Sequence, residues 1–508
     1  MKCNVKIVSV LDIGSNSVRM GVYQNTKDRA ERLDFLEHPL RLGHEVFTTG
    51  RIGTPAIREL STALRGFSQV MKEYGVNEYR AFATTALREA NNRAYVLDQL
   101  HTQNSLTVEV LEDGGESALV FSQLLQSPLL SDSALLAYIG TGSVGLAVSE
   151  GRVITQTGSI TLGFLKLSEI LRDVEDQTTR FHRVLEEYVE TRFRRFRMWL
   201  DGRQFSQLLL TGRELDTIAR LCSAQEKDGV YIIDREQLAA LYERAKNLHA
   251  SVLSRQLSLT EEVADQLLPM LVIYLRMLDL TQAQQILAPR VHIMDSLACQ
   301  MLLPGDKARY EATVRESAAA CARETGRGLR VDLPHAQRVR EYSVLLFNKL
   351  KKLHGVSGKR LLLLECAALL HEAGNGVNAK DPSLATCDLT KQAYLFGLKE
   401  EETLLIGEIA RFGHLRRALS MRDLLPAKQQ LMIDKLGAIL ILADALDESH
   451  RGKLTDCKLR LEGDRLTITS RSREEPHLEQ WAVREAAAFF EEVFGVEPVL
   501  TNKSNLLT

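Results

Sequence analysis

The sequence predicts an α/β region followed by an all-α region. The prediction rests on two similar strand–turn–strand patterns and on a change, after about residue 308, to apolar spacing typical of helices. Residues 5–23 and residues 135–152 each indicate a strand, a short turn rich in glycine and serine, and a second strand. From residue 308 to residue 450, almost every segment has the apolar spacing of a helix. We therefore expect two related α/β halves, residues 1–127 and 128–305, and a helical domain over residues 306–508.

A helix is expected after the first strand pair, in "TPAIRELSTALRGFSQVMKEYG". Thr54 is the predicted N-cap, Pro55 fits the first turn and Gly75 stops the helix. Its predicted buried stripe consists of Ile57, Leu60, Leu64, Phe67, Val70 and Met71.

The rest of the α/β region alternates strands, turns and helices. A strand at 78–83 leads into a turn at Thr84 and Thr85, and "SLTVEVLEDGGESALVFSQLL" indicates a strand, a glycine turn and a helix. The second half opens with the second strand pair and is helix-rich from 170 to 300. Within it, "LLLTGRELDTIARL" indicates a strand, a turn at Gly212 and another helix.

The C-terminal part is expected to be a separate helical domain with short breaks at 355–358, 374–383 and 425–426. After it, "KLTDCKLRLEGDRLTITSRS" predicts a hairpin that turns at Gly463 and Asp464. The segment "WAVREAAAFFEEVFG" predicts a last amphipathic helix.

Charge and composition exclude several classes of protein. The net charge of −2 predicts no general attraction to nucleic acid or to an anionic membrane, so a polyanion would need a local basic patch. No apolar run reaches the ~18 residues that a membrane span needs, and the N-terminal segment turns polar too early for a signal peptide. The seven cysteines are scattered without a C-x-x-C pair, which is typical of reduced thiols. We expect a cytoplasmic protein.

The turn in "VLDIGSNSVRM" has the residues of a phosphate site. Small residues from Gly14 to Ser17 let backbone N–H groups point into one space, and Asp12 places a carboxylate beside them. A phosphate group with its Mg²⁺ needs these partners, because Mg²⁺ takes one or two carboxylates together with phosphate oxygens. The alternative is a β-hairpin with a polar turn and no ligand.

Four segments together resemble one known family. "DIGSNS", "ATTALREA" at 83–90, "IGTGSVGLAV" at 139–148 and "GSITLGFLKLSE" at 158–169 follow the order and spacing of the exopolyphosphatase/guanosine pentaphosphate phosphatase (Ppx/GppA) family. The resemblance is strong from residue 5 to about 170 and weak from 170 to 305. Residues 310–450 resemble the HD-type helical domain that many long members carry.

This resemblance implies a fold, a reaction and partners. The fold is a duplicated actin-like, ribonuclease-H-like region with a cleft between its halves, followed by the HD-type helical domain. The implied reaction is hydrolysis of the terminal phosphoanhydride of inorganic polyphosphate or of guanosine pentaphosphate, with Mg²⁺ or Mn²⁺. The implied partners are polyphosphate or guanosine penta- and tetraphosphate, with no membrane or nucleic acid, in a homodimer.

The resemblance also assigns roles to matched residues. Asp12 would hold the metal, Arg88 would offset the charge of the phosphate chain, and Glu116 would be the general base that orients the attacking water. The residues that would contact phosphate oxygens are Gly14, Ser15, Asn16, Ser17, Gly140, Thr141, Gly142 and Ser143.

Two acidic residues of the family pattern are missing here. The family's second loop, Asp-x-Gly-Gly-Gly-Ser-Thr-Glu, corresponds to residues 138–145, where Tyr138 and Gly145 replace the first and last acids. Loss of one preorganised group commonly lowers a rate by ~10² to 10³. Ser117 and Ala118 after Glu116 also depart from the family's Glu-Ala-Arg. Glu112 and Asp113 are nearby carboxylates that would either hold metal or form a solvated turn.

A second candidate metal site lies in the helical domain. His335, the pair His371–Glu372 and Asp444 stand where HD domains place their ligands, with glutamate in place of the usual aspartate. The longer side chain shifts the ligand oxygens by more than the ~0.2 Å tolerance of a good site. Lys391 and the pair Gly413–His414 stand where catalytic HD domains carry further histidines. The alternative is a packed helical core whose polar residues are satisfied.

Two basic segments have two interpretations each. "TRFRRFRMWL" at 191–200 and "GHLRRALSMR" at 413–422 would either follow a polyphosphate or RNA chain or form the basic face of an amphipathic helix.

The leading hypothesis is thus a divergent phosphohydrolase of this family, and the rival is a binding or regulatory protein that has kept the phosphate cleft without turnover. The pair Tyr138 and Gly145 distinguishes them. A third hypothesis is a metal-dependent phosphohydrolase that works through the helical domain.

Overall fold

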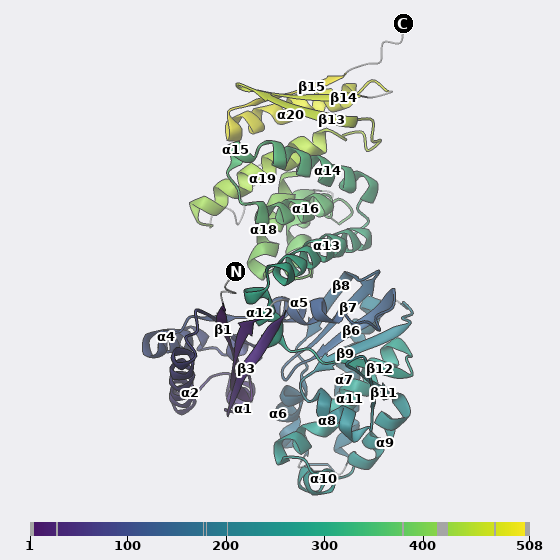
Figure 1. Cartoon of the computed structure of the whole chain (residues 1–508). Coiled ribbons are helices and arrows are strands. Elements are labelled where there is room, and N and C mark those ends of the chain that lie inside the picture. Colours follow the sequence, from purple (N-terminus) through teal and green to yellow (C-terminus); the bar gives the residue numbers. More distant parts are fainter. Residues whose placement is uncertain are drawn as a thin grey trace. The chain divides into compact units, whose positions relative to one another are not determined.

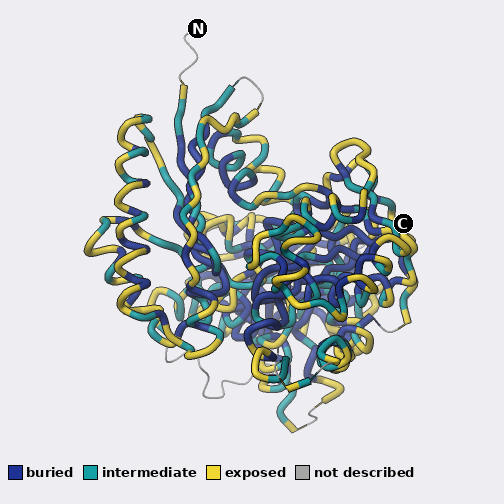
Figure 2. The backbone as a smooth tube through the Cα atoms, turned by 90° about the horizontal axis from the view of Figure 1, so that it is seen from below, coloured by how far each residue is buried: buried dark blue, intermediate teal, exposed yellow. Residues whose placement is uncertain are grey.

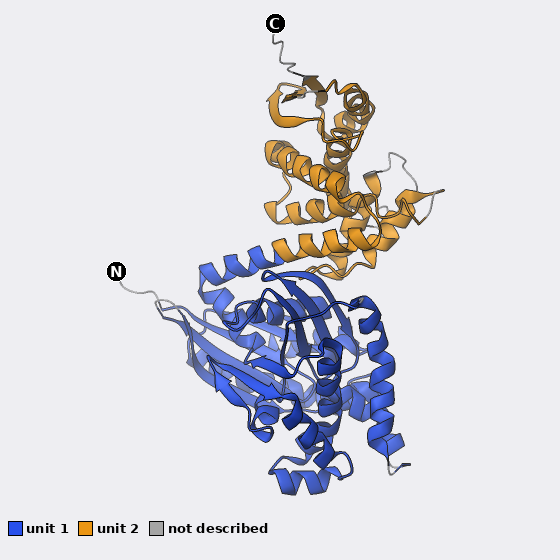
Figure 3. Cartoon of the chain, turned by 90° about the vertical axis from the view of Figure 1, so that its right-hand side faces the viewer, with its two compact units in different colours: residues 1–314 blue, residues 315–508 orange. Residues whose placement is uncertain are grey.

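The computed structural model describes residues 5–26, 29–175, 177–178, 180–200, 202–377, 380–413, 425–471 and 474–502. The chain forms two compact units, residues 1–314 and residues 315–508 (Figure 3). The boundary falls inside helix α13 (Pro304–Gly328), close to the predicted break after residue 305. Unit 1 contains two sheets with helices, and unit 2 is mainly helical (Figure 1).

The first sheet of unit 1 has five strands in the order β3-β2-β1-β4-β5. Its strands are β1 (Ile7–Ile13), β2 (Ser17–Asn25), β3 (Ala30–Pro39), β4 (Glu78–Ala83) and β5 (Val108–Val110). β1 and β2 form the predicted antiparallel pair, and β4 joins β1 in parallel. Most of β1 is buried because helices cover both faces of the sheet, which explains its nearly continuous apolar sequence.

The helices of this half are α1 (Leu42–Thr49), α2 (Thr54–Glu73), α3 (Thr85–Glu89), α4 (Arg93–Asn104) and α5 (Asp113–Leu124). α2 confirms the predicted helix, and all of its predicted stripe is buried except Val70, which is half-buried. Figure 2 shows this alternation of buried and exposed residues along the helices. The predicted cap was wrong: Gly53 is the N-cap, and Thr54 is already helical.

The second sheet has seven strands in the order β10-β11-β12-β9-β6-β7-β8. Its strands are β6 (Ser133–Ile139), β7 (Val144–Glu150), β8 (Val153–Ile160), β9 (Gln207–Gly212), β10 (Gln225–Lys227), β11 (Val230–Asp234) and β12 (Gln285–Pro289). β6 pairs with β7 antiparallel and with β9 parallel, as β1 does with β2 and β4. The two halves therefore share this strand arrangement, as the two similar sequence patterns predicted.

The helices of the second half are α6 (Phe164–Glu175), α7 (Phe181–Leu200), α8 (Leu215–Leu221), α9 (Arg235–Ala245), α10 (Ala250–Leu257), α11 (Glu261–Thr281) and α12 (Ile293–Leu302). α7 contains the first basic segment: Phe193 and Phe196 enter the core while the arginines stay exposed, so it is an amphipathic helix. α12 packs on β1 of the first sheet through Met294 and Leu297, although its position in the sequence placed it with the second half.

Unit 2 contains helices around a buried core and a small sheet. The helices are the end of α13, α14 (Leu333–Lys349), α15 (Lys351–His354), α16 (Leu361–Leu370), α17 (Pro382–Lys391), α18 (Glu400–Ala410), α19 (Ala427–Ala445) and α20 (His477–Phe494), with 3-10 turns at Gly358–Arg360 and Arg411–Gly413. The predicted hairpin is present as β13 (Thr455–Glu462) and β14 (Arg465–Arg471). A strand that the sequence did not predict, β15 (Glu497–Asn502), pairs in parallel with β14.

One predicted segment cannot be compared with the structure. His414 and the rest of the basic segment 414–422 lie outside the described residues. Within the described part of the chain, none of the helices combines the length and the apolar character needed to cross a bilayer.

Candidate functional site

The two strand-pair turns of unit 1 have the same local geometry. The Gly14 N–H donates to the carbonyl of Ser17 at 3.0 Å, and the Gly140 N–H donates to the carbonyl of Ser143 at 2.9 Å. In both turns a glycine closes a tight hairpin and leaves the following residues at its tip. The predicted pair of small-residue bends is therefore present.

The two tips meet at one cavity. The Thr141 hydroxyl donates to the Ser15 hydroxyl at 3.1 Å, which joins the two halves of unit 1. The cavity beside this contact has a volume of about 390 Å³. Of the predicted site residues, the structure brings together around it Asp12, Gly14, Ser15, Glu116, Gly140 and Thr141.

The other predicted phosphate contacts do not line this cavity. Gly142 packs against the side of helix α3: a Cβ there would lie 2.1 Å from Cγ2 of Thr85, so packing requires glycine at this position. The Ser143 hydroxyl donates to Asp113 at 3.3 Å, and the Ser17 hydroxyl accepts from Nε of Arg19 at 3.1 Å. Asn16 is likewise absent from the lining.

One carboxylate oxygen of Asp12 has no hydrogen-bond partner among the described residues. Asp12 is the last but one residue of β1. Its Oδ1 is buried and accepts no hydrogen bond from the part of the chain that the structure describes, and its Oδ2 lies 4.0 Å from Nη1 of Arg19. Burial raises the pKa of Asp12 to about 6, against the opposing effect of Arg19. A buried carboxylate oxygen is normally bonded, so this one is free to accept a ligand from the cavity. A hard cation such as Mg²⁺ suits this oxygen.

Glu116 uses both of its oxygens within the protein. It lies in the first turn of α5, where Oε1 accepts from the Tyr138 hydroxyl at 2.9 Å and Oε2 accepts from Nη1 of Arg88 at 3.2 Å. Burial raises the pKa of Glu116 although Arg88 and Tyr138 oppose the change, and burial beside Glu116 raises the pKa of Tyr138. At position 138, where the family has an aspartate, this chain thus has a tyrosine whose hydroxyl donates to Glu116, the candidate base.

Arg88 does not line the cavity. Its guanidinium forms ion pairs with Asp113 and Glu116 and donates to the Leu111 carbonyl at 2.7 Å and to the Thr85 hydroxyl at 3.1 Å. The structure therefore places Arg88 as a support for the two carboxylates of α5. Asp113 is bound in the same network and is not a solvated turn.

Gly145 stands opposite Tyr138 in the β6–β7 pair. A Cβ on Gly145 would lie 2.8 Å from the hydroxyl oxygen of Ser117, so a glutamate at 145 requires Ser117 to move. Three of the departures from the family pattern, at 117, 138 and 145, are thus neighbours in space.

The sequence reasoning missed the basic side chains of the cavity. They are Arg19, Arg32, Arg213, Arg290 and His292. Arg32 lies 3.9 Å from Asp295, and Arg290 pairs with Asp216 at 3.1 Å. Arg213 forms no ion pair with a described residue, and its Nη2 donates to the Ser17 hydroxyl at 3.4 Å.

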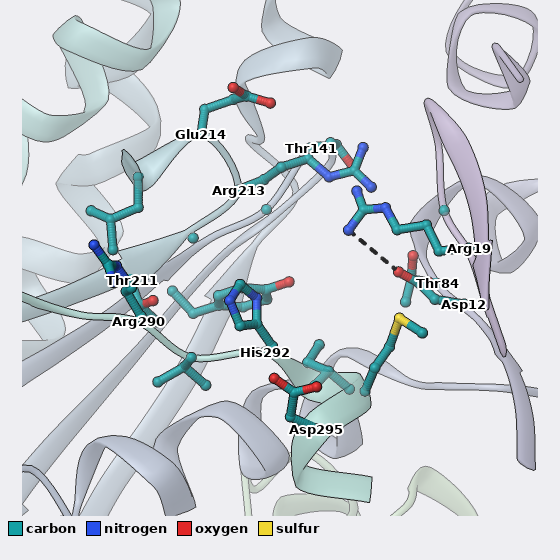
Figure 4. Close-up of a pocket in the computed structure, with 18 of the residues that line it drawn as sticks. Asp12, Arg19, Thr84, Thr141, Thr211, Arg213, Glu214, Arg290, His292 and Asp295 are labelled. Atoms are coloured by element: carbon teal, nitrogen blue, oxygen red, sulfur yellow. Dashed lines mark ion pairs between the residues drawn. The ribbon is translucent and has the colours of Figure 1, made fainter. Parts of the chain in front are cut away.

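Arg213 belongs to the turn after β9, where Gly212 comes close to β6: a Cβ on Gly212 would lie 2.3 Å from the Ile139 carbonyl oxygen. Figure 4 shows Arg213 reaching toward Arg19, close to Asp12. The strand and the turn at Gly212 were predicted, and they were the one signal that could have pointed to Arg213.

The second predicted group lies in unit 2. His335, His371 and Asp444 each place a ligand atom within 4.8 Å of the others, and Glu372 forms a neighbouring group with His335 and His450. His450 was not predicted. Lys391 pairs instead with Glu408 at 2.9 Å.

Comparison with known proteins gives the family. The model of the Ppx/GppA phosphatase family matches residues 23–291, and the model of Ppx/GppA phosphatase domain III matches residues 314–485. A crystal structure of an exopolyphosphatase from Cytophaga hutchinsonii shares the fold, with a TM-score of 0.52 at 19% identity over 58% of this chain and 97% of that one.

Curated relatives are distant. Exopolyphosphatase 1 of Mycobacterium leprae is 30% identical over 115 residues, which cover 22% of this chain and 34% of the relative. Guanosine-5'-triphosphate,3'-diphosphate pyrophosphatase of Photobacterium profundum is 20% identical over 448 residues, covering 86% of this chain and 85% of the relative. The chain spans about a third of the length of the mycobacterial exopolyphosphatases that it matches. Because the first family model alone covers more than half of the residues, and follows the fold and the paired turns described above, this chain belongs to the Ppx/GppA phosphatase family.

Proposed function

We propose that this chain is a phosphohydrolase that releases terminal phosphate from inorganic polyphosphate or guanosine pentaphosphate, with Mg²⁺ or Mn²⁺ held by Asp12. The observation that carries the proposal is the buried Oδ1 of Asp12, which has no hydrogen-bond partner in the described part of the chain. Asp12 and Glu116 line the same cavity as the turns at Gly14 and Gly140. The names of the relatives support this substrate class. The homodimer and the cytoplasmic location remain predictions.

Different groups in the cavity would bind the phosphate chain, balance its charge and orient the attacking water. Backbone N–H groups at the tips of the two turns bind phosphate oxygens, and Arg213 and Arg19 balance the negative charge of the chain. Glu116, held by Tyr138 and Arg88, orients the attacking water and accepts its proton. When bound, the divalent ion would polarise the terminal phosphoryl group. Charge placement of this kind supplies most of the catalysis in phosphoryl transfer.

A second candidate function is binding without turnover. One observation favours it: both oxygens of Glu116 already accept hydrogen bonds from the protein, and Arg88 compensates its charge. A base that is neutralised in this way has less capacity to accept a proton from water. Such a protein would report on polyphosphate or guanosine polyphosphate by binding it in the same cavity.

One experiment separates the two functions. Phosphate release from long-chain polyphosphate and from guanosine pentaphosphate is measured with Mg²⁺, and binding of both is measured by calorimetry. Asp12→Asn and Glu116→Gln are compared with Glu150→Gln, an exposed carboxylate that pairs with Arg203 at the end of β7. Release that is lost in the first two variants and kept in the third supports the phosphohydrolase. Tight binding with no release by the wild type supports the second function, and neither binding nor release refutes both.

A further inference from the structure

The side chains that line the cavity of unit 1 do not form a basic surface. Among the described residues of the lining, the carboxylates outnumber the arginines when His292 is counted as neutral. The carboxylates are Asp12, Glu116, Glu214, Asp216 and Asp295, and the arginines are Arg19, Arg32, Arg213 and Arg290. A polyanion needs a surface of the opposite charge, so the partners of each arginine decide how much of a phosphate chain the cavity can hold.

Positive charge is available in the inner part of the cavity, beside the two glycine turns. Arg213 forms no ion pair with a described residue, and Figure 4 shows it next to Arg19, which pairs with Glu37 at 3.0 Å. The charge of Glu116 is compensated by Arg88 from outside the cavity. A divalent ion at the proposed metal site would add further positive charge. The end of a phosphate chain therefore meets arginine and backbone N–H groups here.

In the outer part of the cavity, Asp295 neutralises Arg32. Nη1 of Arg32, in β3, lies 3.9 Å from Oδ1 of Asp295, in α12. The same oxygen accepts a hydrogen bond from the Tyr23 hydroxyl at 2.7 Å, which fixes the carboxylate. The side chain of Asp295 is 43% exposed and that of Asp12 is 15% exposed, so Asp295 stands where a bound chain would leave the cavity. The next phosphates of a long chain would meet a fixed negative charge and an arginine that is already paired.

A second carboxylate has the same effect on Arg290. Nε of Arg290 lies 3.1 Å from Oδ1 of Asp216, which also accepts a hydrogen bond from the Tyr231 hydroxyl at 2.9 Å. Glu226 forms a further ion pair with Arg290 at 3.2 Å. Figure 4 shows Arg290 well apart from the arginines of the inner part. Both arginines of the outer part are thus held by carboxylates, and neither is available to follow a phosphate chain.

The size of the cavity agrees with a short ligand. Its volume of about 390 Å³ lies near the lower end of the ~300–1,000 Å³ range of small-molecule pockets. A longer polymer would extend past the outer carboxylates, and every phosphate placed beside them would add a repulsive contact.

We propose that this cavity selects the end of a short phosphoanhydride chain, such as tripolyphosphate or the 5′-triphosphate group of a nucleotide, over long-chain polyphosphate. Asp295 is the main specificity-determining residue, because loss of its charge leaves Arg32 without an ion pair to any described residue. Loss of the Asp216 charge has a smaller effect, since Glu226 still holds Arg290. This inference rests on the proposed function and narrows its substrate class.

The test measures binding of tripolyphosphate and of long-chain polyphosphate to the full-length protein by calorimetry with Mg²⁺, with concentrations counted as chain ends. We expect the wild type to bind tripolyphosphate at least about tenfold more tightly, because the long chain meets like charges. This preference should shrink between about 50 mM and about 500 mM salt, since exposed charges are screened.

Asp295→Asn removes the charge and keeps an oxygen for the Tyr23 hydroxyl. It should lower the preference for the short chain by about fivefold or more, and Arg32→Ala added to it should restore part of the preference. Asp216→Asn should act in the same direction with a smaller change. The matched control is Glu150→Gln, an exposed carboxylate outside the cavity lining, which should leave the preference unchanged.

The outcomes separate this inference from the proposed function. Equal affinity of the wild type for both ligands would refute the selectivity and leave the phosphohydrolase standing. An unchanged preference in both Asp295→Asn and Asp216→Asn, each shown to be folded by circular dichroism, would also overturn it. If the wild type binds neither ligand, the proposed phosphate site fails and this inference fails with it.

Discussion

Tyr138 replaces an acid of the family pattern, and its hydroxyl donates a hydrogen bond to Glu116. The contribution of this bond to the stability of unit 1 can be predicted and measured. Tyr138→Phe removes one hydroxyl and leaves the ring, so no cavity forms. Oε1 of the buried Glu116 then loses its donor at 2.9 Å, while Oε2 keeps Arg88. A hydrogen bond to a charged group contributes about 1.5–3 kcal/mol, so we expect the free energy of unfolding of unit 1 to fall by this amount.

The effect should depend on pH in a definite direction. The Tyr138 hydroxyl stabilises the charged carboxylate and so lowers the pKa of Glu116, while burial raises it. Once Glu116 is protonated in the folded protein, the bond to a charged acceptor is lost. The difference between Tyr138→Phe and the wild type should therefore be largest at high pH and shrink as pH falls through the raised pKa of Glu116.

Fluorescence-detected urea unfolding measures this change in unit 1 alone. Trp199 packs against the core of unit 1, and Trp481, which is half-exposed in unit 2, is replaced by phenylalanine in every protein compared. The matched control is Tyr274→Phe. The Tyr274 hydroxyl is buried and has no hydrogen-bond partner among the described residues, so its removal should cost nothing. A Tyr138→Phe protein within about 0.5 kcal/mol of the Tyr274→Phe protein at pH 8 would refute the reasoning, since a bond to a charged group contributes more than that.

Three further predictions concern residues that line the cavity and the glycine turn beside it. In metal-free buffer, Asp12→Asn should stabilise unit 1 by up to about 3 kcal/mol above pH 6 and should not stabilise it below pH 4. The reason is that the pKa of Asp12 is about 6 in the folded protein, against the ordinary 3.8, so ionisation of Asp12 opposes folding. Equal stabilisation at both pH values in urea unfolding would contradict this. Gly142→Ala should destabilise unit 1 by about 1–3 kcal/mol, because the new methyl group would meet Cγ2 of Thr85. Thr85→Ser removes that Cγ2 methyl group, so the double variant should recover part of the lost stability. A double variant no more stable than Gly142→Ala would count against this contact. Arg213→Ala should lower the affinity for tripolyphosphate, measured by calorimetry, by about 10- to 100-fold. The control is Arg203→Ala, which should leave the affinity unchanged because Arg203 pairs with Glu150. Unchanged affinity in Arg213→Ala would show that Arg213 is not part of the binding site.

Local sequence signals predicted the strand pairs, the helix α2 and the helical character of residues 308–450 well. Each of these depends on apolar spacing and on turn residues within about twenty positions, so the signal lies within the segment itself. The errors arose where long-range packing decides. α12 lies on the first sheet because Met294 and Leu297 fill its surface, and β15 forms because the edge of β14 is available to it.

Some residues of the candidate site could likewise be predicted from local sequence, and others could not. Asp12, Gly14, Ser15, Gly140 and Thr141 could be named because a glycine-rich turn between strands has a recognisable sequence. Arg213 could not, since it approaches Ser17 only when residues almost two hundred positions apart are brought together. Arg88 and Glu116 were predicted to be in the site, but their ion pair and its extension to Tyr138 are visible only in the structure.

The sequence by itself determined that two glycine turns each follow a buried strand, and that a carboxylate stands beside the first turn. It also showed that two acidic residues of the family pattern are missing. The tertiary structure decided what replaces them: Tyr138 binds Glu116, Ser117 occupies the space beside Gly145, and Asp12 keeps an unpartnered oxygen. The physical reason is that backbone preference is local, whereas burial, hydrogen-bond pairing and charge compensation depend on which distant side chains share a site.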